Sequence, residues 1–281
     1  MTDATSGYDS PYGDLVETRL RVLSWNLWGR FGPWAKRQPA IVATVAALEP
    51  DIACLQEVWS AEGTSEGTSM AALVAERLGF VHVSSYNDDG PIHSGNAIVS
   101  RWPIVRTDWR PLPAGDEPDE RRIVLFAEID GPRGLIQAFC THLNWRFDHS
   151  VVRQRQVEAI GAFIQECRPR EYPPILCGDM NAAPDSDEIR MLTGRTGVVA
   201  PNLVFHDAWE VAGEGPGMSW SNENPFAAAV VEPARRIDYV LAGWPKRGGL
   251  GHVVSAELAG TRPIDGVVPS DHYGVVAELR Y

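Results

Sequence analysis

The sequence predicts an α/β fold in which two packed sheets are flanked by helices. Short apolar or alternating runs recur along the whole chain, as is typical of strands. Longer segments between some of them carry apolar residues at helical spacing. With 281 residues, of which 44% are hydrophobic, the chain can bury one large core. No linker divides it, so we expect a single large domain.

The first part of the chain alternates predicted strands with predicted helices. Residues 20–24 alternate and predict a strand that ends at a Trp-Asn pair. A helix is expected over about 40–48, and Pro50 stops it. The apolar run 52–56 predicts a buried strand, followed directly by a glutamate. A loop rich in Gly, Ser and Thr over 60–69 then leads to a second helix over 70–78.

A series of strands occupies the middle of the chain. The predicted strands are 80–86, 96–100, 104–109, 122–129 and 135–141. Because turn residues connect them over short distances, we expect an antiparallel or mixed sheet. The clearest helix covers 151–167, with apolar residues at helical spacing and a proline just after its end. Residues 174–177 then predict another buried strand.

The last part of the chain has fewer predicted helices. Residues 237–241, 253–258 and 275–279 alternate as strands. A long connection rich in Gly, Pro and Asn over 213–234 precedes them, and such connections are often functional. At the other end, residues 1–18 are polar and acidic, so we expect a disordered leader.

Export, membrane and redox signals are not visible in the sequence. The leader lacks the basic start and apolar stretch of a signal peptide. No run approaches the roughly 20 apolar residues of a membrane span. We therefore expect a soluble, cytoplasmic protein. The four cysteines form no CxxC pair, and three lie in apolar runs, where buried thiols are expected.

Polar motifs follow or precede the apolar runs in a regular way. They supply the carboxylates, amides and imidazoles that phosphoester hydrolysis needs to bind a cation, activate water and stabilise charge. Any one of them is a weak signal, whereas their combination and order are strong. The seven motifs are Trp25-Asn26, Gln56-Glu57, Gly95-Asn96, Thr141-His142, Gly178-Asp179-Met180-Asn181, Arg236-Ile237-Asp238-Tyr239 and Ser270-Asp271-His272.

This ordered set resembles the endonuclease/exonuclease/phosphatase superfamily. The superfamily includes exonuclease III-type nucleases, deoxyribonuclease I, neutral sphingomyelinases, inositol polyphosphate 5-phosphatases and deadenylases. The resemblance covers about residues 19–281. It implies a four-layer α/β/β/α sandwich of two mixed sheets flanked by helices, with one catalytic domain over 19–281. It also implies metal-dependent hydrolysis of a phosphoester.

The resemblance assigns a metal site to oxygen-bearing side chains. Glu57 is expected to be the principal ligand of Mg²⁺, which needs few protein ligands and keeps several waters. Asn26 and Asp271 would complete the inner or the water-mediated shell. Mn²⁺ is a possible substitute for Mg²⁺.

The catalytic candidates follow from the same resemblance. Asp179 would orient or deprotonate the attacking water, and Asn181 would donate to a phosphoryl oxygen. His272 would contact the phosphoryl group, while Asp238 holds its ring in place. His142 would be a second donor to the phosphate.

The substrate-binding candidates are neutral donors, a cation and an aromatic ring. An arginine at a strand start can contact phosphate with two parallel hydrogen bonds. The aromatic ring has an equally good explanation as core packing. The candidates are Asn96, Arg122 with its neighbour Arg121 as a rival, Asn144, Trp145 and Asn222.

Charge separates the possible substrates. A formal net charge of -12 and acidic loops over 115–120 and 210–223 disfavour duplex nucleic acid, which is bound mainly through Lys and Arg. Scattered basic residues also disfavour an inositol polyphosphate. The leading expectation is a small phosphorylated metabolite or a lipid-headgroup-type ester, with monoester or diester left open. The alternative is a nuclease or deadenylase-like enzyme on single-stranded nucleic acid.

A non-catalytic binding protein is the third possibility. Such a protein should have lost one of the residues on which the chemistry depends. Glu57, Asp179, Asn181 and His272 are all present, which makes this reading the weakest. Oligomeric state and pathway leave no signal in the sequence.

Overall fold

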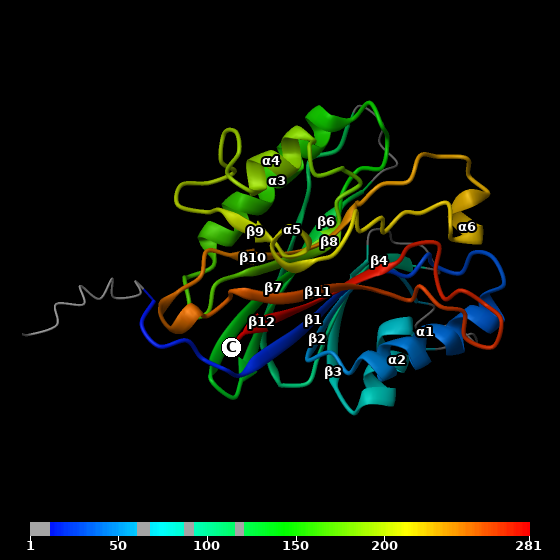
Figure 1. The fold of residues 1–281 in the computed structure, drawn as a ribbon, viewed down its shortest axis with the longest axis horizontal. Coiled ribbons are helices and arrows are strands. Elements are labelled where there is room, and N and C mark those ends of the chain that lie inside the picture. Colours follow the sequence, from blue (N-terminus) through cyan, green and yellow to red (C-terminus); the bar gives the residue numbers. More distant parts are fainter. Residues whose placement is uncertain (1–11, 61–67, 87–92, 116–120) are drawn as a thin grey trace, which may run out of the picture.

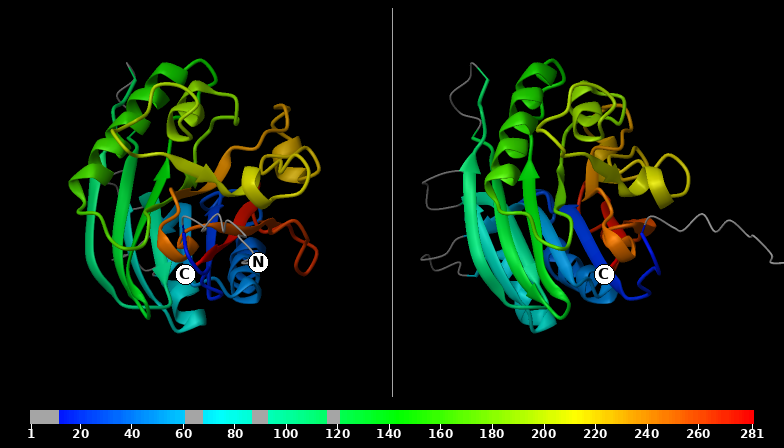
Figure 2. Two further views of the ribbon diagram at one scale, coloured as in Figure 1. Left: turned by 60° about the vertical axis from the view of Figure 1, so that its left-hand side comes forward. Right: turned by 90° about the vertical axis from the view of Figure 1, so that its left-hand side faces the viewer.

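Two mixed sheets pack face to face, with helices on both outer sides (Figure 1, Figure 2). The computed structural model describes residues 12–60, 68–86, 93–115 and 121–281. Each sheet has six strands, so the expected α/β/β/α sandwich is confirmed.

The first sheet has the strand order β11-β12-β1-β2-β4-β3. The pair β1–β2 is parallel and the other pairs are antiparallel. Helices α1 (Trp34–Leu48) and α2 (Met70–Leu78) cover its outer face. The strands are β1 (Arg19–Asn26), β2 (Ile52–Ser60), β3 (Val81–Tyr86), β4 (His93–Ser100), β11 (Val253–Ala259) and β12 (Gly274–Arg280).

The second sheet has the order β5-β6-β7-β8-β10-β9, with β7–β8 as its parallel pair. Helices α3 (Ser150–Glu166) and α4 (Asp187–Leu192) cover it. The strands are β5 (Ile104–Pro111), β6 (Ile123–Gly131), β7 (Gly134–His142), β8 (Ile175–Asp179), β9 (Phe205–Asp207) and β10 (Asp238–Gly243). The remaining short elements are α5 (Ala208–Ala212), α6 (Pro225–Ala228) and the 3-10 turn η1 (Arg247–Gly249).

The central strands are buried on both faces. In β1, Val22 packs between the sheets while its neighbour Leu23 packs against the helices, because successive strand side chains point to opposite faces. Burial on both sides explains why these strands read as continuous apolar runs. The four cysteines are free and buried, as expected, and Cys54, Cys140 and Cys177 lie between the sheets.

The predicted strands and long helices are confirmed, with two shifted starts. Helix α1 begins at Trp34, before the expected start near residue 40, and contains Pro39. A proline removes one backbone donor from a helix and crowds the carbonyl four residues earlier, but packing of the buried face stabilises the turn before it. Strand β4 begins at His93, three residues before its expected start.

The predicted leader is described only from residue 12. Val16 donates its backbone N–H to the carbonyl of Gly248 at 2.9 Å, and Gly248 donates to the carbonyl of Tyr12 at 2.7 Å. Residues 1–11 lie outside the described residues. In the part of the chain that the structure describes, none of the helices has the length and apolar character needed to cross a membrane.

Candidate active site

Strand ends from both sheets bring the predicted motifs to one edge of the sandwich. Strands β1, β7 and β8 end at Asn26, His142 and Asp179, and β10 begins at Asp238. In the second sheet Asp179 lies opposite His142 on one side and Asp238 on the other. The strand register alone therefore places these three side chains together.

Two further side chains at this edge, those of Glu57 and Asn181, come from residues with an unusual backbone conformation. The pairing of β2 with β4 shifts register between Leu55 and Val58, as at a β-bulge. Within it Glu57 has a φ of 49°, in the left-handed region that non-glycine residues seldom adopt. Asn181, after β8, has a φ of 50°. Such conformations cluster at functional sites.

The side-chain amide of Asn26 connects the two sheets. Its Nδ2 lies 3.0 Å from Glu57 Oε1 and 3.0 Å from Asp179 Oδ2, so it donates to both carboxylates. Its Oδ1 accepts the backbone N–H of Trp28 at 2.9 Å, which orients the amide. In this arrangement Asn26 presents its nitrogen, not its oxygen, to the carboxylates.

Asp179 lies at the centre of the site and is 1% exposed. Its Oδ1 accepts the backbone N–H of Asn181 at 2.9 Å. Its Oδ2 lies 3.4 Å from His142 Nε2 and 3.8 Å from His272 Nε2. Burial and the charge of Asp238 raise the pKa of Asp179 to about 6. This carboxyl group therefore exchanges protons much closer to neutral pH than an ordinary aspartate.

His272 is surrounded by carboxylates. Its Nδ1 lies 2.9 Å from Asp238 Oδ2, and its ring meets that of Trp220 at a centroid distance of 4.9 Å. Burial alone would lower the pKa of His272, but Asp238, Asp179 and Asp271 together raise it well above its ordinary value. The imidazolium form is thus favoured in this site.

His142 has the opposite electrostatics. Burial lowers its pKa well below the ordinary value, and the positive charges of Arg122 and His272 lower it further. The neutral ring can still donate one N–H. The two histidines of the site therefore differ in charge.

Asp271 lies beside the Glu57 carboxylate. Burial raises the pKa of Asp271 to about 7; the charge of Glu57 adds to this rise, whereas His272 and Arg37 oppose it. Its Oδ1 accepts from Ser270 Oγ at 3.3 Å. The carboxylates of Glu57 and Asp271 together form a set of hard oxygen donors.

A pocket of about 260 Å³ opens over these residues. Most of the other lining residues are aromatic or charged, and they surround the catalytic and metal-binding candidates. The lining residues are Trp28, Phe31, Glu57, Arg122, His142, Trp145, Asp179, Asn181, Trp220, Glu232, Arg235, Ile237, Asp271 and His272.

The substrate-binding candidates divide into two groups. Arg122 and Trp145 line the pocket, whereas three asparagines are not among its lining residues. Asn96 is buried and donates to the carbonyl of Ile123 at 3.2 Å. Asn144 is buried and accepts the N–H of Arg146 through Oδ1, and Asn222 is exposed. Asn96 and Asn144 therefore use their side chains for hydrogen bonds to the backbone.

Sequence reasoning missed several pocket residues. Trp28 and Phe31 follow the Trp25-Asn26 motif within a few positions, and Glu232 and Arg235 precede the Arg236-Ile237-Asp238 motif. Closeness along the chain to a motif was the only available signal. Without the fold, nothing distinguishes these side chains from ordinary loop residues.

Comparison with known proteins agrees with this geometry. The family model described as "Endonuclease/Exonuclease/phosphatase family" matches residues 23–272. The chain belongs to this family. The resemblance deduced from the seven motifs is therefore confirmed, and the chain is a member of a phosphoesterase superfamily.

Three relatives of the chain are similar to it at identities of 24% to 28%. The "Uncharacterized protein YbhP" of Escherichia coli K12 is 28% identical over 58% of this chain and 66% of its own length. "Inositol phosphosphingolipids phospholipase C" of Schizosaccharomyces pombe is 27% identical over 68% of this chain, which spans 46% of that protein. "Tyrosyl-DNA phosphodiesterase 2" of Xenopus laevis is 24% identical over 94% of this chain and 67% of its own length.

Solved structures of the family share the fold. Truncated Caenorhabditis elegans TDP2 superposes with a TM-score of 0.71 at 20% identity, covering 95% of this chain and 99% of that one. An endonuclease/exonuclease/phosphatase from Bacteroides vulgatus gives a TM-score of 0.70 at 19% identity, over 94% of this chain and 99% of that one. At these identities the likeness concerns the fold.

Proposed function

We propose that the chain is a metal-dependent phosphoesterase that hydrolyses a P–O bond of a small phosphorylated metabolite or of a lipid-headgroup-type ester. One observation carries the proposal: Asp179 is buried and lines the pocket, with its Oδ2 near Asn26, His142 and His272. A carboxylate whose pKa is raised to about 6 is suited to accept a proton from water near neutral pH.

The neighbours of Asp179 fit complementary tasks. Asp179 orients the attacking water and accepts its proton. The cationic ring of His272 stabilises the charge that develops on the phosphoryl oxygens, and neutral His142 donates a further hydrogen bond. Asn181 uses Nδ2 to donate to the carbonyl of Leu143 at 3.1 Å, which leaves its second amide hydrogen for the phosphoryl group.

Glu57 and Asp271 fit a divalent cation. Both line the pocket, and the charge of Glu57 contributes to the raised pKa of Asp271, so a cation between them would relieve their repulsion. When bound, Mg²⁺ or Mn²⁺ supplies Lewis-acid polarisation of the phosphoryl group. Asn26 fits the role of holding the Glu57 carboxylate better than that of a ligand, because its nitrogen faces that group.

The test is metal-dependent product release by the purified protein on phosphomonoesters, small phosphodiesters, phospholipids and single-stranded oligonucleotides. Asp179→Asn, which keeps the shape of the side chain, is the control. Turnover of small or lipid esters that disappears in Asp179→Asn supports the proposal. Near-full activity of the variant would reject the role of Asp179. Metal binding without turnover of any ester would favour a binding protein.

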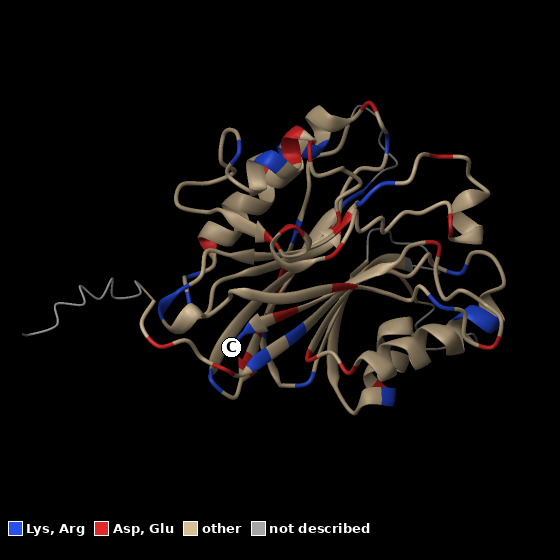
Figure 3. Ribbon diagram, viewed as in Figure 1, with Lys and Arg blue, Asp and Glu red and all other residues tan. Residues whose placement is uncertain are grey.

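Charge supports a substrate with few phosphates. In the view of Figure 3, basic residues are scattered among acidic ones and do not gather into one patch. The chain has a formal net charge of -12, which opposes binding of a duplex. The acidic run over 116–120 lies outside the described residues. The S. pombe relative named as a phospholipase C for inositol phosphosphingolipids is consistent with a lipid-headgroup ester.

A phosphodiesterase acting on single-stranded nucleic acid is the second candidate. Phe31 and Trp145 line the pocket and are 62% and 52% exposed, and aromatic side chains are the residues on which single-stranded bases stack. The Xenopus laevis relative named tyrosyl-DNA phosphodiesterase 2 covers most of the chain. Cleavage of oligonucleotides above the Asp179→Asn background, with esters left intact, would favour this candidate.

A further inference from the structure

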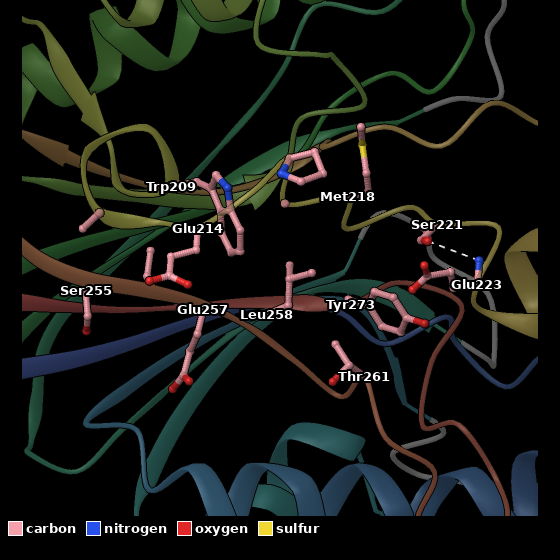
Figure 4. Close-up of a pocket in the computed structure, with 14 residues that line it drawn as sticks. Trp209, Glu214, Met218, Ser221, Glu223, Ser255, Glu257, Leu258, Thr261 and Tyr273 are labelled. Atoms are coloured by element: carbon pink, nitrogen blue, oxygen red, sulfur yellow. Dashed lines mark hydrogen bonds between the residues drawn. The ribbon is translucent and has the colours of Figure 1, made fainter.

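A second groove, larger than the candidate active-site pocket, lies along β11 (Figure 4). It has a volume of about 700 Å³, and none of its lining residues also lines the pocket. One wall is β11 and the other is formed by α5 and the segment that follows it. Nothing in the proposed hydrolysis uses this groove.

The groove follows the free edge of a strand. β11 is the outermost strand of its sheet and pairs only with β12. Four consecutive residues, Ser255–Leu258, line the groove. Because successive side chains point to opposite faces of a sheet, a groove over one face would be lined by alternate residues. Lining by consecutive residues therefore means that the groove runs along the strand edge.

The backbone at this edge is available for pairing. Apart from the ladder with β12, the backbone of residues 254–258 makes no hydrogen bond to any other described residue. An edge strand with free N–H and C=O groups is a template for another extended segment. The groove beside it gives that segment room.

The groove is acidic along its length. Figure 4 shows Glu214 and Glu257 toward one end and Glu223 toward the other, with Leu258 between them. Glu257 pairs with Arg21 at 2.8 Å, whereas Glu214 and Glu223 have no ion pair among the described residues. A partner with several separated positive charges would complement this arrangement.

A single metal ion does not explain these glutamates. Among the described residues, the group of three or more acidic, cysteine or histidine side chains close enough to share one ion is Asp179, Asp238 and His272, and none of these lines the groove. The groove also offers apolar surface and an aromatic ring: Tyr273 lines it, and the residue as a whole is 6% exposed. The hydroxyl of Tyr273 has no hydrogen-bond partner among the described residues.

We propose that this groove binds an extended, basic segment of a partner protein, which adds to the free edge of β11 as a further strand. Main-chain hydrogen bonds to β11 would provide the pairing, and Lys or Arg side chains would face Glu214 and Glu223. Apolar side chains would alternate with the basic ones against Leu258 and Tyr273. This is the strand-addition mode of peptide recognition.

The first test measures binding of a fluorescent peptide of alternating lysine and valine to the full chain by anisotropy. The double variant Glu214→Lys/Glu223→Lys should weaken binding by about ten-fold or more, because like charges then face each other. The control Glu76→Lys/Glu158→Lys changes net charge equally on exposed helical positions elsewhere and should bind as the parent does. Equal losses in both variants would reject a local site.

The second test separates strand addition from simple charge attraction. Two further peptides of the same sequence are N-methylated at alternate residues, one at the odd and one at the even positions. Each keeps its charges but cannot donate backbone hydrogen bonds from one side of the extended chain. Both should bind much more weakly, and the unmodified peptide should slow hydrogen exchange of the β11 amides. Equal binding of the methylated peptides, or full competition by spermine with no protection of β11, would overturn the proposal in favour of a site for a small polycation.

Discussion

His272 Nδ1 lies 2.9 Å from the Asp238 carboxylate, and both side chains are buried. Because a carboxylate only accepts, this contact requires a proton on Nδ1, and the other ring nitrogen, Nε2, lies 3.8 Å from Asp179 Oδ2. Asp238 itself does not line the pocket. Its effect on a substrate would therefore pass through His272.

Replacing Asp238 with Asn should lower the turnover rate by about 10- to 100-fold, as expected when the partner of an active-site histidine is lost. In a His272→Ala background the same replacement should have little further effect. The measurement is a double-mutant cycle on kcat with the best ester found. Losses that multiply across the two sites would show that the residues act independently.

Replacing Glu57 with Gln should raise the Mg²⁺ concentration needed for half-maximal activity by about ten-fold or more, because one charged oxygen donor is lost. Direct Mn²⁺ binding, followed by calorimetry, should weaken in parallel. Glu232→Gln is the matched control: Glu232 lines the same pocket but is paired with Arg235 at 2.8 Å. Unchanged metal dependence in Glu57→Gln would exclude it as the principal ligand.

Arg37 joins two loops of the site and is fully buried. It donates to the carbonyls of Phe31 at 2.7 Å and Pro269 at 2.9 Å, and also to that of Leu27. Arg37→Met would leave these buried carbonyls unpaired, so the free energy of unfolding should fall by about 3 kcal/mol.

Arg37→Lys tests the geometry of this contact, because lysine keeps the charge but lacks the planar fork that reaches several carbonyls. Urea unfolding should place its stability between those of the parent and Arg37→Met. Its KM should rise, since Trp28 and Phe31 on the loop held by Arg37 line the pocket. A lysine variant as stable as the parent would show that charge alone matters here.

The ends of the strands explain why much of the site was predictable. Apolar periodicity identifies a strand, and the first polar residues after it, such as Asn26, His142 and Asp179, must lie at the sheet edge. The order of the motifs along the chain then led to the family resemblance, from which the expected roles of these residues were taken. The same reasoning predicted the long helices, whose buried faces recur over several turns.

Long-range geometry explains what the sequence left unpredicted. The amide of Asn26 bridges Glu57 and Asp179 only because the two sheets meet at this edge, and no local pattern encodes that contact. Strand β9 and helix α5 are too short for periodicity to be recognised. The position of β11 at a sheet edge depends on strand order, which the alternation of residues 253–258 does not specify.

An ion pair far from the pocket predicts part of the pH dependence of stability. Arg170 donates to Glu128 from Nε to Oε2 at 2.7 Å and from Nη2 to Oε1 at 2.9 Å. The hydrogen bonds from Arg170 lower the pKa of Glu128 below its ordinary value of 4.5, against the opposing effect of burial. The folded state thus binds the Glu128 proton more weakly than the unfolded state does.

The stabilisation from Glu128 should therefore be complete above its ordinary pKa and disappear as the pH falls through the lowered one. The difference in unfolding free energy between the parent and Glu128→Gln, measured in urea, should be largest near neutral pH and shrink in acid. Arg170→Met removes the same contact and should show the same trend. A difference that stays constant from neutral to acidic pH would mean that Glu128 stabilises the fold through packing and not through its charge.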